Sequence, residues 1–354
     1  MKAWILKKNG QIEYTDIKTP DINENEALVE VKAAGICGSY IPRIYNDGAY
    51  FYPLIPGPEF SGRVVDVGKK GKKWLNKRVG IYPLIPCREC EPCRKKQYEM
   101  CRHYSYLGSR RNGGFAEYAA VPIANLIELP DNVSFEDAAM IEPMAVAAHA
   151  IRRVGPSQTD SVVICGMGTI GMFILMFLTE MGIKDIHVIG NKEFQHETVM
   201  KVGLAENRYI DCSSGETVFA DVYFECVGKN ETLCRAINET IPGGKIMLVG
   251  NPYSDVFLDK SVYWKILRNQ LTVYGTWNSS FTGDMDDDWH YVLRKLSEGT
   301  IHPSEFISHR FDMQSFVNGL LIMRDKLENY GKILLLPWYK SSSSVEVKNE
   351  RFGY

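Results

Sequence analysis

The chain has 354 residues, of which 45% are hydrophobic and 24% are charged, and its formal net charge at pH 7 is only −2. This composition excludes a disordered chain, the small net charge argues against nucleic acid as a partner, and the length predicts two domains. The apolar run Ala3 to Leu6 is too short for a signal peptide, and the run Met172 to Leu178 is too short for a membrane span. We therefore expect a cytoplasmic protein without a membrane anchor.

The first part of the chain reads as mostly β. Short apolar runs separated by glycine and proline, such as Ala27 to Ala34, Phe60 to Val67 and Arg78 to Tyr82, are typical of strands. We predict a mostly β domain over residues 1–150.

Four of the nine cysteines lie close together, at Cys87, Cys90, Cys93 and Cys101. Their neighbours are mostly polar, so burial in a core does not explain them, and an odd cysteine count does not suggest a disulfide framework. Four thiolates at this spacing favour a closed, structural zinc site. An iron–sulfur cluster or free thiols are the alternatives, but the wider last spacing and Arg102 do not match the ferredoxin pattern.

After Gly155-Pro156 the pattern changes to short apolar runs alternating with longer helical stretches, which predicts βαβ units and a parallel sheet. We predict a dinucleotide-binding Rossmann domain, a doubly wound α/β sheet, over residues 151–283. Residues 284–340 are expected to return to the first domain, and residues 341–354, which open with four serines, to form a flexible tail.

The sequence Gly166-x-Gly168-x-x-Gly171 directly follows the apolar run Ser161 to Cys165 and opens a helical segment. Glycines at this spacing allow a tight turn, close approach of the backbone to a pyrophosphate, and close packing of helix on strand. The pattern predicts a dinucleotide site that includes Thr169 and Ile170.

The end of the next predicted strand bears on the choice of cofactor. An acidic residue there would bind ribose hydroxyls and repel a 2′-phosphate, but the strand Ile186 to Ile189 ends in Gly190-Asn191-Lys192. The missing carboxylate and the positive charge of Lys192 favour NADP(H) over NAD(H). A solvated loop lysine is the alternative reading.

Several motifs together resemble the medium-chain dehydrogenase/reductase family of zinc-containing alcohol dehydrogenases, from about residue 2 to Pro337. Besides the cysteine loop and the glycine motif, they are Gly35-Ile36-Cys37-Gly38-Ser39, Gly57-Pro58-Glu59-Phe60-Ser61-Gly62 and Gly113-Gly114-Phe115-Ala116-Glu117-Tyr118. Within the family, the chain is most similar to polyol-phosphate and polyol dehydrogenases. The resemblance implies a GroES-like first domain, hydride transfer between a nicotinamide and a polyol or polyol phosphate, and a homodimer or homotetramer.

The resemblance also implies a catalytic zinc held by Cys37, by the residue at position 58 and by Glu142, with Glu59 as an alternate ligand. Proline at position 58 has no ligating side chain. Tyr40 replaces the aspartate that orients the zinc-binding histidine in the family. We therefore expect a weakened catalytic zinc site, or alternatively an impaired nicotinamide-binding protein that retains only the structural zinc.

Ser39 matches the family's hydroxyl proton relay, with a turn-capping serine as the alternative reading. Arg43, Arg110 and Arg111 are candidates for binding the substrate, because guanidinium groups suit a phosphate or a polyhydroxy group. Ordinary surface arginines are the alternative.

Overall fold

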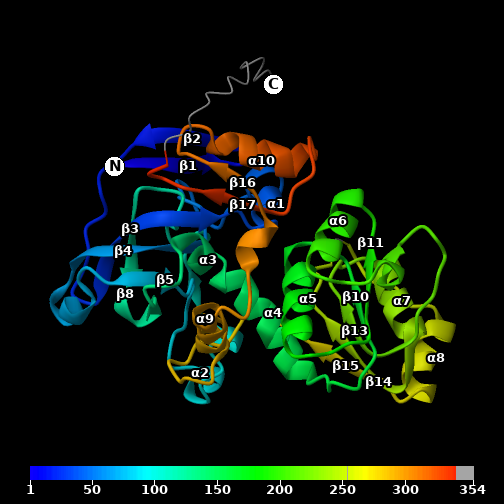
Figure 1. Ribbon diagram of the computed structural model, residues 1–354. Helices are drawn as coiled ribbons and strands as arrows, with labels where there is room; N and C mark the ends of the chain where they lie inside the picture. The colour runs from blue at the N-terminus through cyan, green and yellow to red at the C-terminus, as the bar shows by residue number, and fades with distance from the viewer. Residues whose placement is uncertain (253, 340–354) are drawn as a thin grey trace.

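The computed structural model describes residues 1–252 and 254–339, so the predicted flexible tail, residues 341–354, lies outside the described residues. Two bodies lie side by side (Figure 1), and the helix α4 (Ile141–Val154) runs between them. The left-hand body in Figure 1 contains both the N-terminal part of the chain and its C-terminal segment. In the described residues, no helix is long and apolar enough to span a bilayer.

The right-hand body is built on six parallel strands in the order β12-β11-β10-β13-β14-β15. The strands are β10 (Val162–Cys165), β11 (Ile186–Gly190), β12 (Tyr209–Asp211), β13 (Ala220–Glu225), β14 (Thr240–Leu248) and β15 (Thr272–Gly275). The strand order reverses between β10 and β13, where doubly wound sheets bind nucleotides at the carboxyl ends of the strands. The predicted Rossmann fold is confirmed.

Helices follow the strands of this sheet on both faces (Figure 1). They are α5 (Thr169–Glu180), α6 (Glu193–Lys201), the short helix η4 (Glu206–Arg208), α7 (Asn230–Glu239) and α8 (Lys260–Arg268). Helix α5 is apolar along most of its length, and every residue from Gly171 to Leu178 is buried. A helix that is apolar on all sides is expected where neighbours cover it on all sides.

The left-hand body is mostly β, as predicted. A seven-stranded sheet has the order β16-β17-β3-β4-β5-β9, and β8 also pairs with β3. Its strands are β3 (Glu26–Gly35), β4 (Glu59–Val67), β5 (Arg78–Ile81), β8 (Tyr118–Pro122), β9 (Leu126–Glu128), β16 (Ile307–Phe311) and β17 (Lys332–Leu335). Two small sheets pair β1 (Lys2–Lys8) with β2 (Gln11–Asp16), and β6 (Leu84–Ile85) with β7 (Ser105–Tyr106).

The C-terminal segment returns to this body. Strand β17 pairs antiparallel with β3, so that Leu334 lies opposite Gly35. The helices of the body are α1 (Tyr40–Tyr45), η1 (Lys69–Trp74), α2 (Glu91–Arg94), η2 (Tyr98–Met100), η3 (Ile123–Asn125), α3 (Phe135–Ala139), α9 (Asp288–Glu298), η5 (Pro303–Phe306) and α10 (Phe316–Asp325). The domain boundaries at residues 150, 283 and 340 stay predictions.

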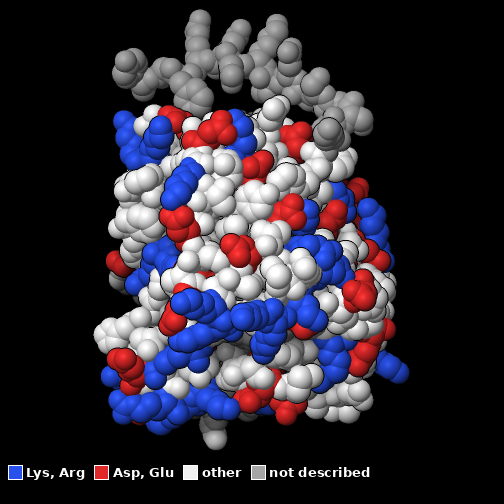
Figure 2. Space-filling view, turned by 90° about the vertical axis from the view of Figure 1, so that its left-hand side faces the viewer, with Lys and Arg blue, Asp and Glu red and all other residues white. Residues whose placement is uncertain are grey.

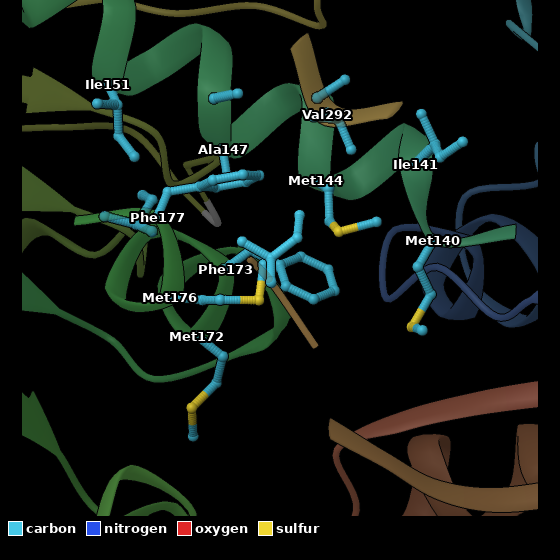
Figure 3. Close-up of a cluster of buried hydrophobic side chains, with 14 of the residues drawn as sticks. Met140, Ile141, Met144, Ala147, Ile151, Met172, Phe173, Met176, Phe177 and Val292 are labelled. Atoms are coloured by element: carbon cyan, nitrogen blue, oxygen red, sulfur yellow. The ribbon is translucent and has the colours of Figure 1, made fainter. Parts of the chain in front are cut away.

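One core joins α4, α5 and α9. Figure 3 shows side chains of α4, such as Met144 and Ala147, beside Phe173 and Phe177 of α5, with Val292 of α9 nearby. Because these residues are buried in a single cluster, α4 links the two bodies through packed apolar side chains and not only through the chain.

A polar contact also ties α4 to α9. The Asp288 carboxylate lies 2.7 Å from His149 Nδ1 and accepts a hydrogen bond of 2.6 Å from Arg152 Nη1. His149 is therefore a helix residue engaged in packing, as the sequence suggested, and takes no part in the candidate site.

One face of the molecule carries charges of both signs. On the face shown in Figure 2, lysine and arginine gather mainly in the lower half, with acidic side chains interspersed. On this face the charges of both signs are therefore mixed.

Candidate active site and metal centre

The four clustered cysteines come together as predicted. The Sγ atoms of Cys87 and Cys93 are 3.9 Å apart, as are those of Cys90 and Cys101. Tetrahedral zinc with Zn–S bonds of about 2.3 Å would separate its sulfurs by about 3.8 Å, so the geometry fits zinc. Backbone N–H groups support the cluster, since the amide of Cys87 donates to Cys101 Sγ at 3.2 Å.

The four thiols differ in their acidity. Backbone hydrogen bonds from Arg102 and Cys93 lower the pKa of the Cys90 thiol to about 6. Burial instead raises the pKa of the Cys93 thiol to about 12. A cation bound among the four sulfurs would favour the thiolate form at every one of them.

The glycine motif lies where the strand order of the parallel sheet reverses. A different physical reason accounts for glycine at each of its three positions. Gly166 has a φ of +100°, and a Cβ there would lie 2.6 Å from Val227 in the loop after β13. A Cβ at Gly171 would overlap the Gly166 carbonyl, whereas a Cβ at Gly168 meets nothing within 4 Å. Gly166 and Gly171 are thus required by the fold, and Gly168 keeps open the space that a pyrophosphate needs.

Helix α5 begins at Thr169, directly after Gly168, and continues through Ile170. Its first amides therefore face the carboxyl end of the sheet, where the macrodipole favours an anion. These residues fit a dinucleotide. The first turn of α5 contains no acidic residue whose carboxylate would compete with the pyrophosphate for the helix amides.

At the end of β11 the structure leaves no space for an acidic residue at position 190. A Cβ on Gly190 would overlap the hydroxyl of Tyr209, which donates to the Lys192 carbonyl at 3.2 Å. Asn191 is exposed. Lys192 lies at the N-cap of α6, with its Nζ 5.3 Å from the centre of the Tyr330 ring.

The motif residues of the first body surround a buried ion pair that the sequence did not reveal. Glu59, the first residue of β4, pairs with Lys332 of β17, and both side chains are buried. Lys332 Nζ also donates to the Ile36 carbonyl at 3.2 Å. A Cβ on Gly35 would overlap Glu59, which explains why glycine stands there. Lysine and glutamate are almost never fully buried unless they are paired.

The remaining candidate zinc ligands also have protein partners. Tyr106 donates a hydrogen bond of 2.9 Å to Glu142 Oε1, and Cys37 Sγ lies 3.0 Å from Ser39 Oγ. Ser39 occupies the N-cap position of α1, but its side chain makes no capping hydrogen bond. Its contact with Cys37 therefore does not support the alternative of a turn-capping serine.

The ligand atoms of Cys37, Glu59 and Glu142 do not all lie within 4.8 Å of one another. Within residues 1–252 and 254–339, only the four-cysteine cluster brings three or more ligand atoms of His, Cys, Asp or Glu within 4.8 Å of one another. Burial, with Glu59 nearby, raises the pKa of the Cys37 thiol to about 12 and that of Glu142 to about 7. Because Pro58 offers no ligand atom, and Glu59 and Glu142 are engaged by Lys332 and Tyr106, these residues do not fit a catalytic zinc.

Tyr40, at the position of the family's aspartate, is buried at the start of α1, only 3% exposed. Burial raises the pKa of its hydroxyl far above the ordinary value, and the charged or polar groups that affect it include Arg43, Cys37 and Ser109. The hydroxyl lies near Ser109 but completes no hydrogen bond.

The loop that follows Tyr106 lies against the proline that replaces the expected histidine. A Cβ on Gly108 would be 2.9 Å from the Pro58 nitrogen, which shows how closely the two segments approach. Ser109 is the next residue in this loop, so Pro58 and Tyr40 border the same short segment.

The three candidate arginines separate into two groups. Arg111 forms an ion pair of 2.5 Å with Glu26 and is thereby neutralised. Arg43 and Arg110 instead stack on the Tyr50 ring, with their Cζ atoms 5.1 and 4.4 Å from its centre. In the described part of the chain, neither has a carboxylate within ion-pair distance, and Nε of Arg43 is buried without a partner.

Comparison with known proteins identifies the family. Residues 23–131 match the model of the alcohol dehydrogenase GroES-like domain, and residues 136–318 match that of the glucose dehydrogenase C-terminus. The chain belongs to the medium-chain dehydrogenase/reductase family of zinc-containing alcohol dehydrogenases, whose members are oxidoreductases.

Among its relatives, galactitol 1-phosphate 5-dehydrogenase of Escherichia coli K12 is 31% identical over 350 residues, which cover 95% of this chain and 100% of the relative. The crystal structure of galactitol-1-phosphate dehydrogenase from E. coli superposes with a TM-score of 0.88, again at 31% identity and with coverages of 95% and 100%. A solved alcohol dehydrogenase from E. coli CFT073 in complex with NADH has a TM-score of 0.85 at 26% identity, covering 95% of this chain and 99% of that one.

Sequence reasoning missed Lys332, Tyr106 and Tyr50. Lys332 carried one usable signal, because a charged residue that opens an apolar strand needs a buried partner. The two tyrosines carried none, since tyrosine is common both in cores and on surfaces.

Proposed function

We propose that this protein transfers hydride between NADP(H) and a phosphorylated polyol. The observation that carries the proposal is the pair Arg43 and Arg110, which stack on Tyr50 without a neutralising carboxylate in the described residues. Arg43 also lies over the Tyr40 ring, and the Tyr40 amide donates to the Cys37 carbonyl at 3.0 Å. Guanidinium groups held in place by aromatic rings are suited to a phosphate, which they bind through paired, charge-assisted hydrogen bonds. The likeness to galactitol 1-phosphate 5-dehydrogenase supports the same substrate class.

In this proposal the two arginines orient the substrate by its phosphate end, and α1 brings Ser39 and Tyr40 to the reacting carbon. A bound nicotinamide supplies or accepts the hydride. Ser39, in contact with Cys37, is placed to carry the hydroxyl proton away from the site. Tight positioning of this kind contributes much of the rate enhancement of an enzyme.

We also propose a structural zinc at Cys87, Cys90, Cys93 and Cys101. The closed set of four sulfurs leaves no position for substrate, so this metal would stabilise the loop and take no part in chemistry.

The substrate proposal predicts a phosphate-specific loss in arginine variants. Arg110→Gln and Arg43→Gln should each lower kcat/KM for galactitol 1-phosphate by about 10- to 100-fold, because each removes charge-assisted hydrogen bonds. The activity with unphosphorylated galactitol should change little. Arg111→Gln, in the same loop but already paired with Glu26, is the control and should leave both activities within about threefold. Equal losses with both substrates would contradict a phosphate site.

The preference for NADP(H) is proposed from the end of β11. Lys192 has no carboxylate partner in the described residues, and Gly190 leaves no room for the acid that selects NAD(H). NADH is the cofactor in the related structure from E. coli CFT073, so the ribose-binding loop has to be tested directly.

Lys192→Glu should weaken NADPH binding at least about tenfold and leave NADH binding within about threefold, since only the 2′-phosphate is repelled. Fluorescence titration with each reduced cofactor measures both constants. Lys184→Glu makes the same charge change at the opposite end of β11 and should alter neither. A mutation at Gly190 is a poorer probe because any side chain there collides with Tyr209. Equal weakening of both cofactors would argue against NADP(H) selection.

A second candidate function is a non-catalytic nicotinamide-binding protein with one zinc. The observation that favours it is that, in the described residues, the ligand atoms of Cys37, Glu59 and Glu142 do not form a group within 4.8 Å. Cofactor binding without turnover of galactitol 1-phosphate by the wild-type protein would support this candidate.

We further propose a homodimer or homotetramer that forms through β15 and α8. Strand β15 ends the parallel sheet with Val273 42% exposed, and α8 has no buried residue although it carries Tyr263, Trp264 and Leu267. An uncovered edge strand beside exposed aromatic side chains is a suitable surface for a second copy.

A further inference from the structure

Hydride transfer requires a group that polarises the reacting oxygen of the substrate. In many enzymes a metal does this, but the residues of this site do not form a metal-binding site. Glu59 is engaged by Lys332, Glu142 by Tyr106, and Cys37 by Ser39. Pro58 contributes no ligand atom. Some other group must bind the oxygen if the site is to transfer hydride.

Two side chains of α1 have a buried polar atom without a hydrogen-bond partner in the described residues, Arg43 at Nε and Tyr40 at its hydroxyl, and the Tyr40 hydroxyl lies near Cys37 and Glu142. A buried hydroxyl that makes no hydrogen bond is costly to the fold. The side chain is 3% exposed, so solvent does not compensate this cost. A group kept in this state is a strong candidate to bind a ligand.

The surroundings of the hydroxyl define what it would bind. Cys37 and Glu142 lie near it, as do Arg43 and Ser109. Burial keeps the phenol neutral, and a neutral phenol donates a hydrogen bond. The complementary ligand is an uncharged or developing oxygen acceptor, such as the carbonyl of a ketose or the oxygen of an alcohol.

We propose that Tyr40 takes the place of a catalytic metal: its hydroxyl donates a hydrogen bond to the reacting oxygen of the substrate in a site without zinc. This role of Tyr40 rests on the proposed function, hydride transfer to or from a polyol phosphate. Replacement of both the aspartate and the histidine of the family pattern then has one explanation, because a site without the metal needs neither a ligand at position 58 nor its orienting carboxylate at position 40.

The first arm of the test counts zinc by mass spectrometry. Wild type and Tyr40→Phe should both contain one zinc per chain, held by the four cysteines. The double variant Tyr40→Asp/Pro58→His, which restores the family pattern, should bind more. Two zinc ions per wild-type chain, the second one lost from a Cys37→Ala variant, would overturn the proposal.

The second arm measures binding of a small oxygen acceptor. Dimethyl sulfoxide is titrated into the complex of protein and NADPH, with cofactor fluorescence as the signal. Tyr40→Phe should bind this probe about fivefold or more weakly than wild type, whereas Tyr45→Phe, on the same helix but next to Arg324, should bind it as wild type does. Equal affinities in wild type and Tyr40→Phe, or no binding to wild type, would overturn the proposal.

The third arm is turnover. With galactitol 1-phosphate, Tyr40→Phe should lower kcat/KM by about 100-fold, as loss of one donor to a reacting oxygen does elsewhere, while its melting temperature stays equal to or above that of wild type. A loss of activity that follows a lower melting temperature would mark a structural role and contradict the proposal. If no polyol phosphate is turned over but the first two arms succeed, the proposed function fails and the oxygen-binding role of Tyr40 stands.

Discussion

Replacing Lys332 by methionine is expected to lower the free energy of unfolding by about 3–5 kcal/mol. The change removes the cation that pairs with Glu59 in the described residues, and the Glu59 side chain is 1% exposed. A carboxylate left buried without its partner pays the full desolvation penalty, which is why breaking a buried pair is so costly. Chemical denaturation followed by circular dichroism measures the difference.

The matched control is the double variant Glu59→Gln/Lys332→Met, which removes both charges. It should recover most of the lost stability, because a neutral pair of similar shape has no uncompensated charge. If the double variant were as unstable as the sum of the two single variants, the ion pair would not explain the effect. The result also bears on the metal, since a carboxylate held this firmly by lysine is not free to bind zinc.

The second large effect is expected on zinc binding, when one thiol of the cysteine loop is removed. Cys93→Ser should weaken zinc binding by more than about 100-fold, exceeding the 10- to 100-fold typical of changes next to the ligands, because one of four direct bonds is lost. The protein should then contain less than one zinc per chain after dialysis against a chelator. Serine is nearly isosteric with cysteine, so the change tests ligation and not packing.

The consequences should extend beyond the loop. Lys96 of the loop pairs with Asp284 at 2.9 Å, close to the start of α9. Without the metal we expect faster proteolysis between residues 87 and 101. Cys212→Ser, at an exposed cysteine far from the cluster in the sequence, should change neither zinc content nor proteolysis. An unchanged zinc content in Cys93→Ser, or a visible absorption band in the wild type, would contradict structural zinc and favour free thiols or an iron–sulfur cluster.

The pattern of the sequence was sufficient for the architecture. Short apolar runs separated by glycine and proline predicted strands such as β3 and β4, and the switch to longer helical stretches after Gly155 predicted the parallel sheet. The spacing of Gly166, Gly168 and Gly171 predicted the dinucleotide turn because the local geometry of the turn requires glycine at these positions.

The candidate site was less accessible to sequence reasoning. Position and motif drew attention to Cys37, Glu59 and Glu142, but the three do not form a metal-binding group in the described residues. Similarly, the sequence did not distinguish among the three arginines as candidates for binding the substrate. The structure does, because Arg111 donates a hydrogen bond to Glu26, which lies 85 residues away in the sequence. A motif gives the residue types near a site, but not which of them are already paired.

By itself, the sequence determined the two-domain α/β architecture, the dinucleotide turn and the cysteine cluster, because each depends on residues close together along the chain. Only the tertiary structure showed which side chains of the candidate site are already paired. Glu59 and Lys332 are 273 residues apart, and Arg43 and Arg110 meet on Tyr50 through two separate segments. Such pairings follow from how β17 returns to β3 and how the loop after Tyr106 packs, and a side chain's partner is set by that packing and not by its own type.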